Sequence, residues 1–72
     1  MGIIYTDHAE GRVAKRLIKK EWIESALNKP DRLIDAKGGR KQAIKKINGE
    51  EISVIFVKEN ETFIVVTVFW GE

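Results

Sequence analysis

The sequence has no cysteine, one proline and one histidine among its 72 residues. Without cysteine there is no disulfide and no thiolate, and a single histidine argues against a zinc site. No apolar run approaches the roughly 20 residues of a membrane-spanning helix, and Asp7 interrupts the start before a signal peptide could form. We therefore expect one cytoplasmic domain, residues 1–72, without metal, cofactor or membrane contact.

The charges are distributed unevenly along the chain. Residues 1–47 carry twelve Lys and Arg against six acids, a net charge of +6, whereas residues 48–72 carry one Lys against five acids, −4. Such asymmetry indicates a polyanionic partner for the first part. The plain alternative is a lysine-rich face that only meets water.

The last third of the chain predicts a β-hairpin. Residues 50–58 and 62–70 are rich in β-branched and aromatic residues and flank a polar break at Asn60. Neither run alternates cleanly, and strands that are apolar on both faces are usually covered on both. The chain is too short to cover both faces, so we expect a partner, for example a homodimer through this hairpin.

The first two thirds predict two helices and two further strands. One helix begins at Thr6 or Asp7, with Asp7 and Glu10 resembling a capping box, and ends near residue 17. The second covers residues 19–28 and stops before Pro30. Strands follow over residues 32–35 and 40–47, the latter ending at Asn48-Gly49, a type I′ turn signal. With Gly2–Tyr5 as an apolar lead, we expect an α+β fold, an N-terminal αα-hairpin packed on a four-stranded antiparallel β-meander.

The first helix carries a basic stripe. At 100° per residue, five side chains fall within about a third of the helix circumference: His8, Arg12, Lys15, Arg16 and Lys19. The stripe includes the only histidine.

The order of these residues resembles a known family. The pattern comprises Tyr5-Thr6-x-His8-Ala9-x-x-Arg12-x-x-x-Arg16, Leu27-Asn28-x-Pro30, Gly39-Arg40 and the final strand Ile64–Val68. It is similar to the domain-of-unknown-function family forty-two fifty-eight, which is grouped with the RelE/ParE-like toxins. Leu17 stands where a helix-ending Gly is common in the family, and Lys19 where a Ser or Thr cap is common.

The resemblance implies a RelE/ParE-like fold and a toxin-like protein of a toxin–antitoxin pair. Relatives include metal-independent ribonucleases, although ParE-type relatives act on DNA gyrase. The implied antitoxin would wrap its toxin with a segment that orders on binding. We expect it on the apolar face of the strands Ile52–Val57 and Phe63–Phe69.

The stripe has the residue types that metal-independent RNA cleavage needs. Attack by the RNA's own 2′-hydroxyl requires a base, an acid and cations around the phosphate. His8 suits the proton transfer near neutral pH, and Arg12 and Arg16 suit phosphate binding. These three are the candidate catalytic residues. Four more are candidate RNA-binding residues: Lys15, Lys19, Arg40 and Trp70.

Simpler interpretations remain open. His8 can be a structural histidine, and Arg12 and Arg16 can form ordinary surface pairs with Glu10, Glu24 or Asp35. Tyr5 could stack an RNA base but fits a core position better, and Trp70 is the most ambiguous aromatic residue. The alternative function is a non-catalytic RNA- or protein-binding module that self-associates or binds an antitoxin-like partner.

Overall fold

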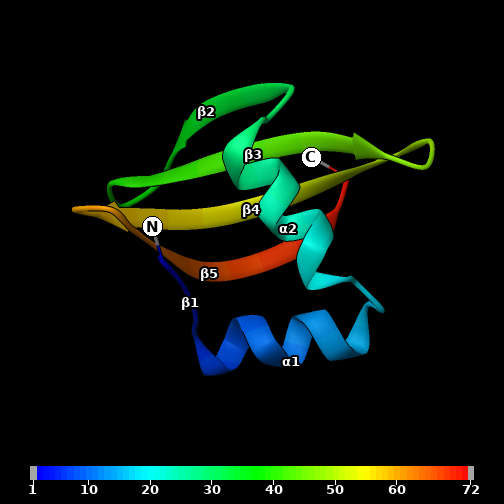
Figure 1. The fold of residues 1–72 in the computed structure, drawn as a ribbon, viewed down its shortest axis with the longest axis horizontal. Coiled ribbons are helices and arrows are strands. Elements are labelled where there is room, and N and C mark those ends of the chain that lie inside the picture. Colours follow the sequence, from blue (N-terminus) through cyan, green and yellow to red (C-terminus); the bar gives the residue numbers. More distant parts are fainter. Residues whose placement is uncertain (1, 72) are drawn as a thin grey trace.

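A computed structural model describes residues 2–71 and has an α+β fold, with two helices and one five-stranded mixed sheet (Figure 1). The elements in chain order are β1 (Gly2–Tyr5), α1 (Asp7–Lys15), α2 (Lys20–Asn28), β2 (Arg32–Ala36), β3 (Arg40–Ile47), β4 (Glu50–Glu59) and β5 (Thr62–Trp70). The strand order is β1-β5-β4-β3-β2. The α+β class and the antiparallel order of the last four strands are therefore as predicted.

The apolar segment before the first helix, Gly2–Tyr5, forms a fifth strand. The predicted four-stranded meander is therefore incomplete. Gly2–Tyr5 pairs in parallel with the beginning of β5, so that Ile3 lies beside Phe63 and Tyr5 beside Val65. Thr6 continues the contact, because its N–H donates to the carbonyl of Val65. The sheet is therefore mixed.

A bulge explains why the last strand does not alternate cleanly. The register between β4 and β5 shifts at Ile55/Phe56, so that Ile55 pairs with Thr67 and Phe56 with Val65. Val66 is the extra residue, and side chains beyond it change face relative to simple alternation. Four residues of β5 consequently share the helix-covered face: Phe63, Val65, Val68 and Trp70.

Two features of the sequence define α1. Thr6 is the N-cap, and its hydroxyl accepts a hydrogen bond from the N–H of Ala9 at 3.1 Å. The predicted capping box formed by Asp7 and Glu10 is therefore wrong. At the other end, Leu17 has φ 55°, and the N–H of Ile18 donates to the carbonyl of Val13. This is a Schellman-type end, in which Leu17 occupies a position that usually requires Gly.

The helices cover different parts of the same sheet face. α1 packs against β5 and β1, whereas α2 lies across β3 and β4 (Figure 1). Between them and the sheet lies the core, which includes Ala9, Ile23, Leu27, Val54 and Val68. The expected αα-hairpin is thus a pair of helices that each pack on their own strands.

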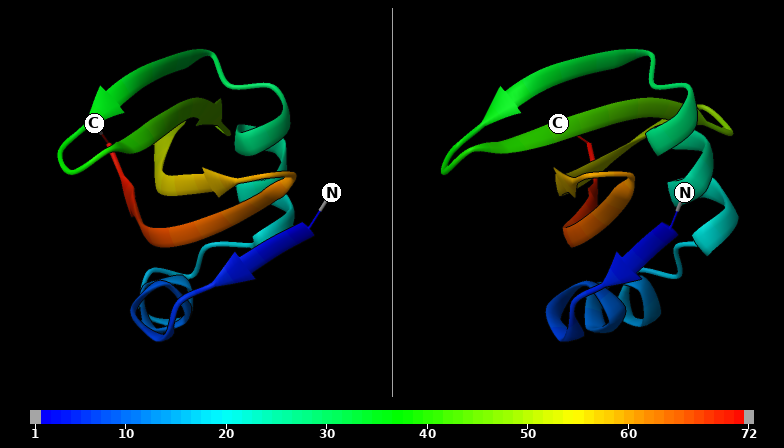
Figure 2. Two further views of the ribbon diagram at one scale, coloured as in Figure 1. Left: turned by 90° about the vertical axis from the view of Figure 1, so that its left-hand side faces the viewer. Right: turned by 60° about the vertical axis from the view of Figure 1, so that its left-hand side comes forward.

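The second face of the sheet is partly closed by its own curvature (Figure 2). Ile44 and Ser53, neighbours on this face, are fully buried. Gln42 donates a hydrogen bond to the Ser53 hydroxyl, which itself donates to the carbonyl of Gly71 just after β5. The second face of the hairpin is accordingly half-buried, and the large exposed apolar side chains of the described residues lie elsewhere: Ile4, Leu17, Leu33 and Ile34.

Candidate nucleic-acid interface

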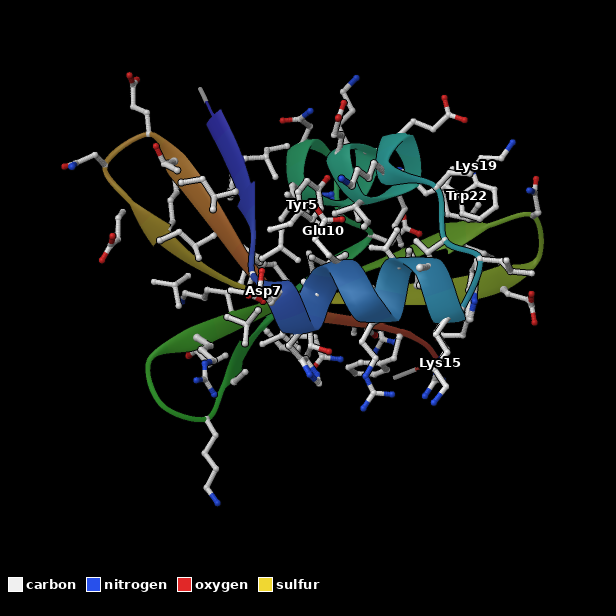
Figure 3. All side chains as sticks on the ribbon, turned by 90° about the horizontal axis from the view of Figure 1, so that it is seen from below. Tyr5, Asp7, Glu10, Lys15, Lys19 and Trp22 are labelled. Atoms are coloured by element: carbon white, nitrogen blue, oxygen red, sulfur yellow. The ribbon has the colours of Figure 1, made fainter. Side chains whose placement is uncertain are left out.

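α1 presents four of the predicted stripe residues on one side: His8, Arg12, Lys15 and Arg16. Their spacing places them along one side of the helix, and only Arg12 is partly buried. Figure 3 shows that Lys15 points away from α2, whereas Glu10 points to the α2 side. The helix therefore separates a basic outer side from a side that faces α2. We call the four residues the α1 stripe.

His8 and Arg12 are in direct contact. The Nε of Arg12 donates to the Nε2 of His8 over 3.4 Å, a long hydrogen bond on an exposed surface. The Nε2 atom can accept this bond only when it carries no proton. The contact therefore sets an imidazole that can act as a base beside a cationic guanidinium.

Two of the three acids predicted to pair with the arginines are engaged elsewhere. Glu10 pairs with Lys20 at 3.0 Å, and Asp35 pairs with Lys41. Within residues 2–71, neither Arg12 nor Arg16 forms a salt bridge with an acid. The guanidinium groups of the stripe are thus available to an anion.

Trp70 lies at the end of the stripe but is held in the structure. Its indole Nε1 donates to the main-chain carbonyl of Arg16 at 3.2 Å. Its ring meets that of Trp22 edge to face, with 5.7 Å between the centroids and 63° between the planes. The indole is half-buried. The stacking of an RNA base on Trp70 stays a prediction. The hydrogen bond and the ring contact give Trp70 a structural role.

Lys19 does not lie on the α1 stripe, contrary to the helical projection. The left-handed Leu17 ends α1 at Lys15, and Lys19 becomes the N-cap residue of α2. Its ammonium lies 5.5 Å from the centroid of the Trp22 ring. In Figure 3 both residues lie on the α2 side of the helix. Any contact of Lys19 with RNA would be on another side of the protein from Lys15.

Arg40 is exposed and belongs to a different part of the surface. It begins β3, three residues before the core residue Ala43, so alternation along the strand places it on the sheet face opposite the helices. β4 lies between its strand and β5, on which α1 packs. The structure thus gathers four of the seven predicted site residues on α1 and its C-cap Arg16, places Trp70 at their end, and separates Lys19 and Arg40.

The α1 stripe lies outside two cavities of the described residues. One cavity of about 380 Å³ is lined by Ile3, Tyr5, Glu24 and Asn28. A second, of about 290 Å³, is lined mainly by apolar side chains that include Leu27, Leu33 and Phe63. Neither contains a residue of the α1 stripe.

Tyr5 precedes α1 and carries a buried polar group. Its hydroxyl is buried and has no hydrogen-bond partner within residues 2–71. Burial, with the negative charges of Glu24 and Glu10, raises the pKa of the Tyr5 phenol. The ammonium of Lys20 lies 4.6 Å from the ring centroid. Sequence reasoning treated Tyr5 as a core or base-stacking residue and had no signal for the unpaired hydroxyl.

Two negative findings concern the described residues. No group of three or more His, Asp or Glu side chains lies close enough together to hold a metal ion. In the same part of the chain, neither helix is long and apolar enough to cross a membrane.

The family follows from a direct comparison. Residues 5–70, which are nearly the whole chain, match the family described as "Domain of unknown function (DUF4258)". The protein therefore belongs to the DUF4258 family. Searches of curated proteins and of solved structures found no match.

Proposed function

We propose that this protein binds RNA through the α1 stripe and cleaves it as a metal-independent endoribonuclease of RelE-like type. The observation that carries the proposal is the contact between His8 Nε2 and Arg12 Nε, 3.4 Å apart on an exposed helix surface. A phosphate held by Arg12 would bring the neighbouring 2′-hydroxyl within reach of the neutral imidazole.

The chemistry divides among the stripe residues. His8 takes the proton of the 2′-hydroxyl, whose oxygen attacks the phosphorus and displaces the 5′-oxygen. The products are a 2′,3′-cyclic phosphate and a 5′-hydroxyl end, the latter receiving a proton from the protonated imidazole or from water. Arg12 and Arg16 stabilise the negative charge that develops on the phosphate oxygens. Lys15 adds a sequence-independent phosphate contact.

A second function is favoured by a different observation. The stripe lies outside both cavities, whereas electrostatic catalysis depends on sites that exclude water. The alternative is therefore a binding module that holds RNA, or an antitoxin-like protein, without cutting it. In that case the half-buried second face of β4 and β5 is the place for the protein partner.

Induced expression in cells distinguishes RNA cleavage from binding without cleavage. The wild type, His8→Ala and Arg12→Ala are each induced in cells, and total RNA ends are mapped by primer extension. Cleavage predicts growth arrest and new RNA ends for the wild type alone, with 5′-hydroxyl termini. Binding without cleavage predicts intact RNA for all three proteins. All three should melt at nearly the same temperature, because His8 is exposed and its contact with Arg12 is long.

The antitoxin site has its own test. Ile55→Glu and Val66→Glu place a charge on the second face of the hairpin, where both residues are half-buried. Loss of co-purification with an antitoxin encoded beside the protein, at unchanged helical content, would support this placement. Unchanged partner binding by both variants would contradict it.

A further inference from the structure

β2 is an open edge of the sheet. It is the last strand in the order β1-β5-β4-β3-β2 and pairs only with β3 within residues 2–71. In an antiparallel pair, alternate residues turn their N–H and C=O groups away from the neighbour. β2 therefore presents unpaired backbone groups to solvent, which is a template for another strand.

The edge is apolar on both faces. Leu33 is 54% exposed and Ile34 44% exposed, and because they are consecutive they lie on opposite faces. Natural edge strands are commonly protected by lysine, proline or a bulge. β2 contains neither lysine nor proline, and its register with β3 is continuous from Arg32 to Ala36. These three protections are absent from β2, whose charged residues are Arg32 and Asp35.

The other edge strand differs. β1 also exposes one large apolar side chain, Ile4, at 55%. However, Ile3 and Tyr5 pack against the core, and the chain turns into α1 directly after the strand. β1 is therefore a matched comparison for β2, because it also ends the sheet and exposes one isoleucine to a similar extent, but it is shorter, with four residues against five.

The charges around β2 fit a second copy of the same strand. Asp31 precedes the strand and Lys37 follows it. Antiparallel self-pairing brings the Asp31 end of one copy beside the Lys37 end of the other, whereas parallel pairing would bring like ends together. With Ile34 on the two-fold axis, Arg32 lies opposite Ala36 and Leu33 opposite Asp35, so no like charges face each other.

We propose that β2 is the interface of a symmetric homodimer, in which the β2 strands of two copies pair antiparallel with Ile34 opposite Ile34. The two five-stranded sheets then form one continuous sheet. The formal net charge of +2 opposes this association only weakly. β2 and α1 lie at opposite sides of the protein (Figure 1), so the α1 stripes remain outside the interface and the proposal is independent of RNA cleavage.

Cysteine trapping tests both the contact and its register. The chain has no cysteine, so Ile34→Cys introduces the only thiol. Directly opposite residues in an antiparallel pair have Cα atoms about 4.5–5.5 Å apart, within the range of a disulfide. We expect Ile34→Cys to form a covalent dimer about tenfold faster than Ile4→Cys under mild oxidation, because pairing raises the effective concentration. Leu33→Cys should also be slower, since the register places Leu33 opposite Asp35.

Sedimentation analysis provides a test without cross-linking. The wild type should contain dimer at about 100 µM, a concentration typical of a weak and small interface. Ile34→Lys should be monomeric, and Ile4→Lys should remain dimeric. At concentrations low enough for the wild type to be monomeric, all variants should melt like it, because both isoleucines are substantially exposed. A monomeric wild type, equal cross-linking of Ile34→Cys and Ile4→Cys, or a dimer lost in Ile55→Glu but retained in Ile34→Lys would overturn the proposal.

Discussion

The indole N–H of Trp70 donates a hydrogen bond to the main-chain carbonyl of Arg16, 3.2 Å away, so the last strand of the sheet holds the C-terminus of the first helix. Carbonyl groups at a helix end have no partner within the helix. The same indole meets Trp22 of α2 edge to face. One side chain thus connects β5 with both helices, and its geometry supports the end of the α1 stripe.

Replacement of Trp70 separates this structural role from base stacking. Trp70→Phe keeps an aromatic ring but loses the donor, so we expect the free energy of unfolding to fall by about 1 kcal/mol. Trp70→Ala should cost about 2–3 kcal/mol, less than for a fully buried ring. Urea denaturation followed by circular dichroism measures both. Unchanged stability combined with lost RNA affinity would instead show that Trp70 serves RNA alone.

Leu17 is a second site where a change should be informative. Its φ of 55° disfavours any residue with a Cβ, and its side chain is 83% exposed. Leu17→Gly should therefore raise the free energy of unfolding by about 1 kcal/mol. Leu17→Ala is the control, because alanine has the same backbone penalty and should change stability little. A Leu17→Gly protein less stable than Leu17→Ala would contradict the assigned helix end.

Tyr5→Phe should stabilise the protein. The substitution removes a buried hydroxyl that has no hydrogen-bond partner within residues 2–71, and the gain should be about 1 kcal/mol. Thermal melts of the two proteins near neutral pH measure it. A destabilised Tyr5→Phe would show that the hydroxyl has a partner, for example water in the adjoining cavity.

The pH dependence of stability should also report on Tyr5. Burial, followed by Glu24 and Glu10, raises the pKa of the phenol above its ordinary value of 10.0. The folded state then holds the proton more tightly than the unfolded state. The stability that this adds is fully present below pH 10 and is lost as the pH rises through the folded pKa. Wild-type stability should fall more steeply than that of Tyr5→Phe in this alkaline range. Because Tyr5 is the only tyrosine, its phenol absorbance gives the titration directly.

Salt dependence should distinguish residues on the stripe from those off it. Each phosphate contact releases counterions, so Arg12→Gln and Arg16→Gln should each lower the slope of log binding constant against log salt by about 1. Lys19→Gln is the matched control, because the Leu17 turn carries Lys19 to the α2 side. RNA binding is measured by fluorescence anisotropy at several salt concentrations. Equal effects of Arg12→Gln and Lys19→Gln would contradict the stripe as the RNA contact.

Local signals in the sequence predicted the local structure well. The Asn48-Gly49 turn has positive φ at both residues, as the type I′ signal requires, and α2 ends at Asn28 before Pro30 as predicted. The i, i+4 spacing placed His8 beside Arg12, and the two side chains are in contact. In each case the determining interaction lies within a few residues along the chain.

Nonlocal features were not predictable in the same way. The parallel pairing of Gly2–Tyr5 with β5 has no local signature, because four apolar residues before a helix are equally typical of a buried lead. The bulge at Val66 was also not predicted. Without it, the sequence of β5 appeared to place apolar side chains on both faces of the strand. Lys19 was placed on the stripe because the projection continued the helix through Leu17, where the backbone turns left-handed.

The contact between Thr6 and β5 has a consequence for how the protein is made. The Thr6 hydroxyl donates to the carbonyl of Val66 at 3.0 Å, across 60 residues of chain, while it also caps α1. Contacts between distant residues slow folding, because a long loop must close before they form. During synthesis, β1 and α1 emerge before β5 and find their strand only when β5 has left the ribosome. The basic helix therefore acquires its fixed place last, and a nascent or truncated chain that lacks β5 would not hold it there.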